Sequence, residues 1–266
     1  MRWAAAATQS AWEEGNARSV PVPWTKLDQV IRPKGGNCCV VMAAPGVGKT
    51  TFMLNWAVRS NAKTLYISSD TSPHDVTAQL GALATRDDRS MVESRLMESR
   101  VWREEYAKAI FAKYPNLVLD FAPRPSMGDI RNKAEALTEL WGEPPELIVM
   151  DTASNVAMKD MSDNAEWQRV WLQSISLARD LNTFFVFAHH VKQGPARSGR
   201  VAPDLNDGLW GCDQFPEFVF GLHSPASNEL VLTVRKNRGG LKDVPVKMRA
   251  TLATARIEDP DISSTF

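Results

Sequence analysis

The sequence predicts a three-layer α/β fold, with a mostly parallel central sheet and antiparallel strands near the C-terminus. Two observations predict this fold. From about residue 37, short and wholly apolar runs alternate with longer amphipathic stretches, which is typical of a parallel sheet covered by helices on both faces. In the last 50 residues, apolar runs follow one another with no room for helices, which indicates an antiparallel extension of the same sheet.

The apolar runs define the expected parallel strands, and the stretches between them define the expected helices. The strands are NCCVVMA (37–43), TLYISS (64–69), LVLDF (117–121), ELIVM (146–150) and TFFVFA (183–188). The helices are expected over 50–60, over 73–113 with breaks, over 127–141 and over 164–181. Ser126, with Asp129 three residues later, resembles a capping box at the start of the third helix. Ile130, Leu137, Leu140 and Trp141 then share one face at helical spacing.

The C-terminal extension contains the remaining strands. They are EFVFGL (217–222), ELVLTV (229–234), PVKMRA (245–250) and TARIE (254–258). We therefore expect one domain over residues 21–258, preceded by an N-terminal helix or arm over 1–20 and followed by a polar, loose tail over 259–266.

Composition narrows the class of protein. Lys and Arg together number 31, as do Asp and Glu, so the net charge is zero and any grip on nucleic acid must come from local basic loops. The three cysteines show no Cys-x-x-Cys spacing, which argues against a zinc site. No apolar run approaches the roughly 18 residues of a membrane span, and the first residues lack a signal-peptide pattern. We therefore expect a cytoplasmic protein without a membrane partner.

The clearest motif is a phosphate-binding loop at residues 43–50, AAPGVGKT, with Ala43 where Gly is usual. An expected strand enters the loop and an expected helix leaves it. Glycines let successive N–H groups point at one phosphate, and the helix N-terminus adds its partial positive charge. This pattern predicts that the chain binds ATP with Mg²⁺. The residues expected to bind the nucleotide are Ala44, Pro45, Gly46, Val47, Gly48, Lys49, Thr50 and Thr51.

Two carboxylates are candidates for the chemistry beside this loop. Asp151 ends the apolar run LIVM, at the strand end where ligands bind in parallel sheets, and is expected to hold Mg²⁺ together with the Thr50 hydroxyl. Asp70 ends another strand and could position the water for hydrolysis. Its place before Thr-Ser-Pro suits a helix cap equally well, so the residues alone leave both roles open.

Taken together, these segments resemble the motor domain of the bacterial replicative helicase DnaB and its phage relatives, within the RecA superfamily. The resemblance runs from about Pro21 to Ala250 and rests on four segments. They are GVGKTTFMLNWA (46–57), YISSDTSP (66–73), LVLDFAPRPSMGDIRNKAEAL (117–137) and LIVMD (147–151). The resemblance implies a RecA-like fold in a short, phage-type or stand-alone form. It also places Asp70 where the family has a catalytic Glu, one methylene longer.

Two further segments acquire a role through the resemblance. His190 lies within FFVFAHHVK (184–192), at the position where the family has a Gln that senses the γ-phosphate. Imidazole can donate a hydrogen bond to phosphate, so this role is chemically retained. Lys236 and Arg238 in VRKNRGG (234–240) match a family Lys-x-Arg-x-Gly segment that reaches the ATP of the neighbouring subunit. The resemblance thus implies a homo-oligomeric ring, a hexamer, in which the N-terminal arm could dock on a neighbour.

The same resemblance implies contacts with single-stranded DNA. Lys192, Arg197 and Arg200 lie in a Gly- and Pro-containing loop after His190, and Lys159 lies in a second loop. Flexible cationic loops grip phosphates without reading bases. Composition alone, however, favours solvated loops with ordinary charges.

The sequence leaves several functions open. The first is an ATP-driven helicase or translocase on single-stranded DNA, with replication or recombination proteins as partners. The second is a recombinase-like or recombination-mediator ATPase. A small-molecule kinase would need a mobile lid and would leave Lys236 and Arg238 unexplained, while a GTPase is disfavoured because Asn-Lys-x-Asp is absent. A fourth candidate is a non-motor ATP switch, because Asp70 is shorter than Glu.

Overall fold

The computed structural model describes residues 17–160, 162–191, 194–208, 211 and 214–260, and its centre is one nine-stranded sheet. The strand order is β3-β2-β4-β5-β1-β6-β7-β8-β9. The strands are β1 (Cys38–Ala43), β2 (Thr64–Ser68), β3 (Leu117–Asp120), β4 (Leu147–Asp151), β5 (Phe184–His190), β6 (Phe218–Ala226), β7 (Glu229–Asn237), β8 (Val244–Thr251) and β9 (Arg256–Glu258). The predicted α/β fold is confirmed.

The sheet is parallel as far as β6, which runs alongside β1, and turns antiparallel only at the β6–β7 pair. The expected antiparallel extension therefore begins one strand later than the sequence suggested. β1 lies between β5 and β6, so all six of its residues are buried. A strand covered on both faces and paired on both edges has no polar side to present, which explains the unbroken apolar run CCVVMA.

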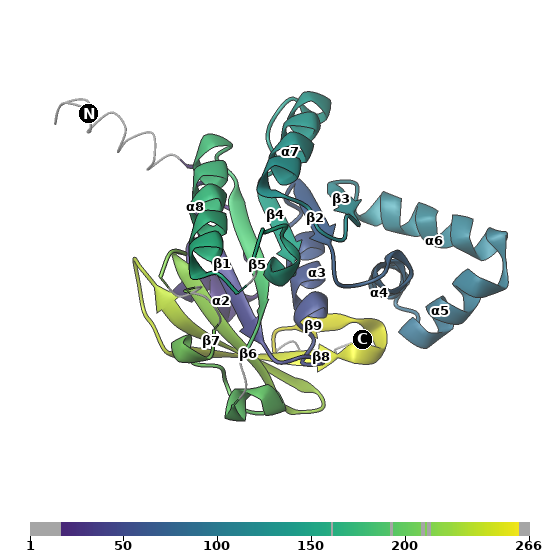
Figure 1. Cartoon of the computed structure of the whole chain (residues 1–266). Helices are drawn as coiled ribbons and strands as arrows, with labels where there is room; N and C mark the ends of the chain where they lie inside the picture. The colour runs from purple at the N-terminus through teal and green to yellow at the C-terminus, as the bar shows by residue number, and fades with distance from the viewer. Residues whose placement is uncertain (1–16, 161, 192–193, 209–210, 212–213, 261–266) are drawn as a thin grey trace.

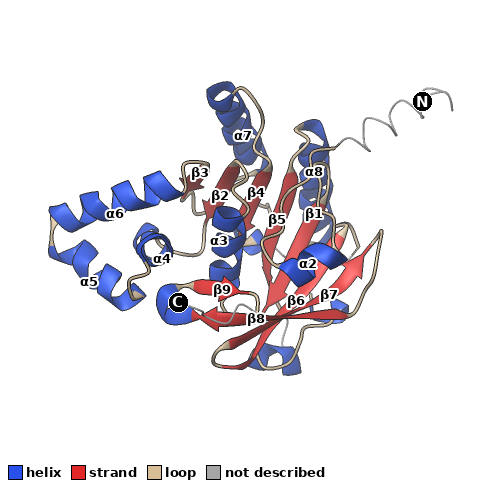
Figure 2. Ribbon diagram, turned by 180° about the vertical axis from the view of Figure 1, so that it is seen from behind, coloured by secondary structure: helices blue, strands red, loops and turns tan. Residues whose placement is uncertain are grey.

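Helices cover both faces of the sheet. The α-helices are α2 (Thr25–Val30), α3 (Lys49–Arg59), α4 (Pro73–Thr85), α5 (Arg89–Glu98), α6 (Arg100–Lys113), α7 (Met127–Trp141) and α8 (Asn164–Asp180). Helices α7 and α8 lie on one face (Figure 1), and α2 and α3 lie on the other (Figure 2). Among the described helices, none is long and apolar enough to cross a membrane.

An aromatic cluster fixes α2 and α3 against the sheet. The rings of Trp24 and Phe52 stack with centroids 4.6 Å apart, and Trp56 meets both edge-on. Trp56 also contacts the rings of Phe184 and Phe220 on β5 and β6. Because α3 begins at the phosphate loop, this packing fixes the position of that loop relative to the sheet.

Helix α7 starts and packs largely as its sequence suggests. Ser126 and Asp129 form the predicted capping box. Ile130 and Leu137 are buried, but Leu140 is exposed, so its expected place on the core face is wrong. A spacing of three from Leu137 turns Leu140 away from the sheet, and the next inward position falls to the half-buried Trp141.

Helices α4, α5 and α6 extend beyond β3 at the edge of the sheet (Figure 1). They are held together by a small core of their own, formed by Ala78, Ala82, Val92, Leu96 and Tyr106. The predicted helical stretch 73–113 is thus broken at 86–88 and at Ser99.

Candidate nucleotide-binding site

The phosphate loop joins the end of β1 to the start of α3, in the middle of the sheet. Gly46 and Gly48 have φ angles of +78° and +100°, values that side chains with a Cβ rarely adopt. Gly48 is also the N-cap of α3, and no side chain caps this helix. Its first N–H groups are therefore left for an anionic ligand, which is the arrangement that the sequence predicted.

Lys49, the first residue of α3, contacts a residue from the end of a neighbouring strand. Its Nζ lies 3.2 Å from Nδ1 of His190 at the end of β5. Burial lowers the pKa of Lys49, and the carboxylates of Asp151 and Asp70 oppose this shift. Because a protonated Lys49 can only donate, Nδ1 of a neutral His190 must accept, which leaves the imidazole proton on Nε2.

The Asp151 carboxylate at the end of β4 is buried and hydrogen-bonded from two sides. Its Oδ2 accepts from the Thr50 hydroxyl at 2.7 Å and from the Tyr66 hydroxyl at 3.0 Å. Burial raises the pKa of Asp151, although these hydrogen bonds and Lys49 act against the shift. A carboxylate beside a hydroxyl at the phosphate loop supplies the hard oxygen ligands that Mg²⁺ prefers, so Thr50 and Asp151 fit such an ion.

Tyr66 was not among the residues expected at the site. It is fully buried on β2, and its own pKa is raised by burial and then by the Asp151 charge. The signal in the sequence was the Tyr66 hydroxyl between the apolar residues Leu65 and Ile67. Only the parallel pairing of β2 with β4, in which Ser68 lies opposite Asp151, shows where that hydroxyl points.

Asp70 follows β2 and faces the same group of residues. Its Oδ2 lies 3.8 Å from Nε2 of His190, and its side chain is 54% exposed. The preceding Ser69 ties this turn to β4, because its N–H and its hydroxyl both donate to the Asp151 carbonyl, at 2.8 and 3.0 Å. The Ser69 hydroxyl also accepts from the N–H of Thr152 at 3.1 Å. Asp70 is thus a solvent-accessible carboxylate on a fixed backbone.

Asp70 does not cap the helix that follows it. Ser72 is the N-cap of α4, where its hydroxyl accepts from the N–H of Asp75 at 3.1 Å. The alternative structural role that the sequence left open for Asp70 is therefore filled by Ser72.

Lys236 and Arg238 lie toward the end of the central strands that is opposite the phosphate loop. Lys236 pairs with Val219 on β6, which in turn pairs with Val40 near the start of β1. Arg238 follows β7, and its N–H donates to the Glu217 carbonyl just before β6. Along the strand direction, about 10 Å of β1 separates Lys236 from its own phosphate loop, and nearly the whole length of β1, roughly 16 Å at about 3.3 Å per residue, separates Arg238 from it.

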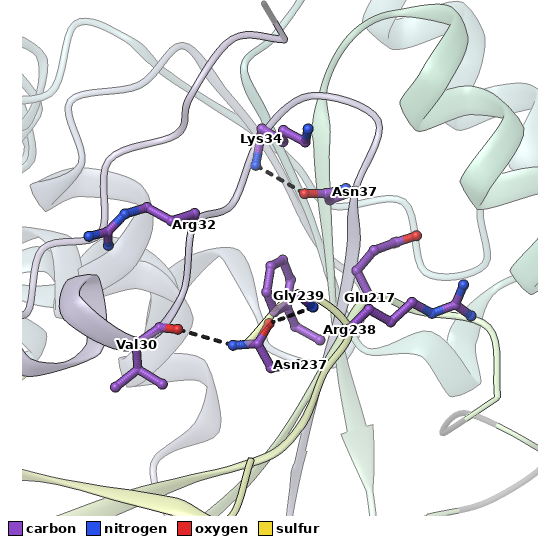
Figure 3. A pocket seen from close by; sticks show the side chains of 9 residues that line it. Val30, Arg32, Lys34, Asn37, Glu217, Asn237, Arg238 and Gly239 are labelled. Carbon is purple, nitrogen blue, oxygen red and sulfur yellow. Dashed lines mark hydrogen bonds between the residues drawn. The ribbon is translucent and has the colours of Figure 1, made fainter. Parts of the chain in front are cut away.

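A pocket of about 220 Å³ adjoins Arg238 at this end of the strands. Figure 3 shows Arg32, Lys34 and Arg238 around it, with Glu217 as the acidic member. The Arg238 guanidinium donates to the carbonyls of Gln214 and Phe215, at 3.1 and 3.3 Å, and remains exposed. The Lys236 ammonium donates to the same Gln214 carbonyl at 3.0 Å.

The described cationic residues that were expected to contact DNA lie on two separate segments of the chain. Lys159 is exposed and lines a groove of about 380 Å³ between the start of α7 and α8. Lys192 lies outside the described residues. Arg197 and Arg200 are exposed, on and just after the short helix η2 (Pro195–Ser198), which packs against the phosphate loop. The backbone that carries these two arginines therefore lies beside the phosphate loop.

Similarity to known proteins agrees with this geometry. A family model described as "AAA domain" matches residues 6–196. The chain belongs to this AAA domain family. Two of its relatives are the Gene 65 proteins of Mycobacterium phages L5 and D29. The first is 28% identical, and the match covers 88% of this chain and 90% of the relative. The second is also 28% identical, and the match covers 77% and 89%.

Solved structures show which fold this AAA domain has. A solved ATPase domain superposes with a TM-score of 0.78 over 97% of this chain and 98% of that one, at 15% identity. A DnaB-like replicative helicase, whose structure was described with its interactions with primase, gives 0.79 over 98% and 68%, at 16% identity. The RadB recombinase gives 0.60 over 91% and 100%, at 15% identity. The chain therefore has the RecA-like fold of DnaB-type ATPase domains and is a P-loop ATPase by family and fold.

Proposed function

We propose that this protein is an ATP-hydrolysing ring ATPase that binds single-stranded DNA and acts as a DnaB-like helicase or translocase. One observation carries the proposal. Five residues with the chemistry of ATP hydrolysis meet at one end of the central strands. Two cations that could act as a finger in a neighbouring ATP site lie toward the other end. The five are Lys49, Thr50, Asp70, Asp151 and His190, and the two are Lys236 and Arg238.

In this proposal each of the five residues has a separate role in phosphoryl transfer. Lys49 and the N–H groups of the phosphate loop bind the β- and γ-phosphates. Mg²⁺ held by Thr50 and Asp151 would neutralise charge on the phosphate oxygens. Asp70, exposed and fixed through Ser69, orients the attacking water and accepts its proton. The Nε2–H of His190 donates to the γ-phosphate and reports its presence.

The oligomeric part of the proposal follows from reach. The length of β1 puts Arg238 roughly 16 Å from its own phosphate loop. An extended Arg side chain is much shorter than that distance. Arg238 therefore cannot serve the phosphate loop of its own chain. If it serves as an arginine finger, it must do so in a neighbouring copy, and head-to-tail repetition of that contact closes a ring or extends a filament. We propose a hexameric ring.

Single-stranded DNA is proposed as the track, with replication or recombination proteins as partners. One of the similar solved structures is a replicative helicase that interacts with primase, which supports a role of this class. The cationic groove with Lys159 and the segment containing Lys192 and Arg200 are the surfaces proposed to meet DNA phosphates.

The deciding experiment measures ATP hydrolysis with and without single-stranded DNA, for the wild type, Lys49→Ala and Arg238→Ala. Several-fold stimulation by DNA, lost in both variants, supports a DNA-dependent ATPase with a finger acting between subunits. If DNA has no effect and Arg238→Ala hydrolyses ATP at the wild-type rate, the ring-helicase proposal is wrong and a non-motor switch or a kinase becomes the better account.

A recombinase-like ATPase is the second candidate, because the fold also superposes on the RadB recombinase. The two functions differ in what happens to duplex DNA. A helicase displaces a strand only while ATP is hydrolysed, whereas a recombinase pairs or exchanges strands. A strand-displacement assay with a forked duplex, run beside a strand-pairing assay, separates them.

A further inference from the structure

We propose that Arg197 contacts the γ-phosphate of the ATP bound by its own chain, and so belongs to the nucleotide site instead of the DNA-binding surface. This inference rests on the proposed function, because it assigns a further binding residue to the proposed ATP site.

The first support is the packing of η2 on the phosphate loop. Gly199 directly follows η2 and has a φ of +73°. A Cβ built there would lie 2.7 Å from Cγ2 of Val47 in the phosphate loop, so the Gly199 backbone approaches the Val47 side chain more closely than any other residue could. Ala196, next to Arg197, is buried in the main core.

The second support is that η2 is anchored independently of any ligand. The N–H of Ser224 on β6 donates to the Gly199 carbonyl at 2.7 Å, and the N–H of Arg197 donates to the Gly194 carbonyl at 3.0 Å. Since β6 pairs with β1, the same sheet that holds the phosphate loop also holds η2. The backbone that carries Arg197 is thus part of the wall of the site.

The third support is the charge and freedom of the side chain. The positive charge of Arg197 is the last of the causes that shift the pKa of His190, after burial and the charges of Lys49, Asp70 and Asp151. The charge of Arg197 therefore acts on the residue proposed to sense the γ-phosphate. Arg197 is exposed, and no hydrogen bond or ion pair joins its guanidinium to another of the described residues.

The charge balance of the site gives the reason for another cation. Among the described residues in mutual contact there, Lys49 supplies one positive charge, whereas Asp70 and Asp151 supply two negative charges. His190 has a lowered pKa and is neutral at pH 7. Without Mg²⁺ the cluster is thus net negative, and the Mg²⁺ proposed at Thr50 and Asp151 would offset that charge. The triphosphate brings further negative charge, and a guanidinium binds phosphate through paired, charge-assisted hydrogen bonds.

The test compares Arg197→Gln with Arg200→Gln, a matched control because both arginines are exposed and lie three residues apart in the same segment. Affinities for ATPγS and for ADP are measured by calorimetry. Affinity for a fluorescein-labelled oligothymidylate is measured without nucleotide by anisotropy. A hydrogen bond to a charged group contributes about 1.5–3 kcal/mol, so Arg197→Gln should weaken ATPγS binding about 10- to 100-fold. ADP and DNA binding should stay near wild type, and Arg200→Gln should leave both nucleotide affinities unchanged.

Three results would overturn the inference. Equal weakening of ATPγS and ADP would mean that Arg197 supports the loop without contacting the γ-phosphate. Unchanged nucleotide affinity with weaker DNA binding would return Arg197 to the DNA surface. A matching loss of ATPγS affinity in Arg200→Gln would show a general charge effect. Lys49→Ala keeps the two proposals distinguishable: if it binds ATPγS as tightly as the wild type, the proposed ATP site itself is wrong.

Discussion

The Nζ of Lys49 lies 3.2 Å from Nδ1 of His190, so the phosphate-loop lysine and the end of β5 are directly coupled. In this pair Nδ1 accepts, which keeps the remaining imidazole proton on Nε2, the nitrogen that lies 3.8 Å from Asp70. A nucleotide that draws Lys49 to its phosphates would release this pairing. In the proposed function, this contact would let nucleotide binding at Lys49 affect the end of β5.

His190→Gln should retain most of the ATPase activity, whereas His190→Ala should not. Glutamine also offers an N–H donor at the end of β5, but alanine offers none, and losing one hydrogen bond to a charged phosphate costs about 10- to 100-fold. Steady-state ATP hydrolysis of the two variants measures the difference. Equal loss in both would mean that His190 does more than donate a hydrogen bond.

The His190 site should also make the protein less stable in acid. Burial, followed by the charge of Lys49, lowers the pKa of His190. Below the ordinary value of about 6.5 the unfolded chain binds a proton that the folded site resists, so the free energy of unfolding falls as the pH drops through that value. His190→Gln should lose less stability between about pH 7 and pH 5.5 in urea denaturation. His223, also shifted downward, remains in both proteins, so only the difference between the two curves is informative.

Asp151→Asn should stabilise the fold and abolish Mg²⁺-dependent hydrolysis. Burial raises the pKa of Asp151, which means that the folded state disfavours its charge. The amide removes that charge while its oxygen can still accept from Thr50 and Tyr66. We expect a gain of about 0.5–2 kcal/mol at neutral pH, typical of sites where function opposes stability. Because the folded carboxyl holds its proton to higher pH than the unfolded one, the gain should shrink on acidification.

Chemical denaturation without nucleotide or metal measures this gain, and a parallel ATPase assay measures the loss. Thr50→Val is the matched control, because it removes the hydrogen bond to Asp151 and leaves the buried charge less compensated. That variant should be less stable than the wild type. Destabilisation by Asp151→Asn would contradict the proposed burial cost.

Mixing two inactive variants should restore ATP hydrolysis. Arg238→Ala retains its phosphate loop and Lys49→Ala retains the proposed finger, so in the proposed ring a mixture would contain interfaces with both functional parts. Since an arginine finger contributes roughly 10³- to 10⁵-fold to turnover, even a small share of competent interfaces is measurable. Hydrolysis is recorded as the ratio of the two proteins is varied. A mixture no more active than its components, in rings shown to exchange subunits, would argue against a finger acting between subunits.

Gly199→Ala should destabilise the protein more than Gly142→Ala. Both glycines have a φ of +73°, but only at Gly199 would a Cβ meet a neighbour, the Val47 side chain at 2.7 Å. Alanine in the left-handed region costs about 1 kcal/mol at either position, and overpacking adds about 1–3 kcal/mol at Gly199 alone. The difference between the two denaturation midpoints thus isolates the contact between η2 and the phosphate loop. Equal effects would show that this contact is loose.

The sequence by itself determined most of the local structure. Strands such as Cys38–Ala43 and Leu147–Asp151 are short apolar runs whose pattern is independent of their neighbours, and the cap at Ser126 depends on residues three apart. The phosphate loop and the strand-end position of Asp151 were equally local signals. For the same reason Leu140 was misplaced, because helical spacing gives a face only to within one position and the sheet decides which residue is buried.

Only the tertiary structure decided how these parts meet. The strand order brings β1, β2, β4 and β5 together, so that Tyr66 reaches Asp151 and His190 reaches Lys49 across long sequence separations. The register of β1, β6 and β7 puts Arg238 at the end of the strands opposite the phosphate loop. The packing of Gly199 on Val47 puts the backbone next to Arg197 beside the phosphate loop. Strand pairing and close packing depend on contacts between distant segments, and no short-range pattern in the chain encodes them.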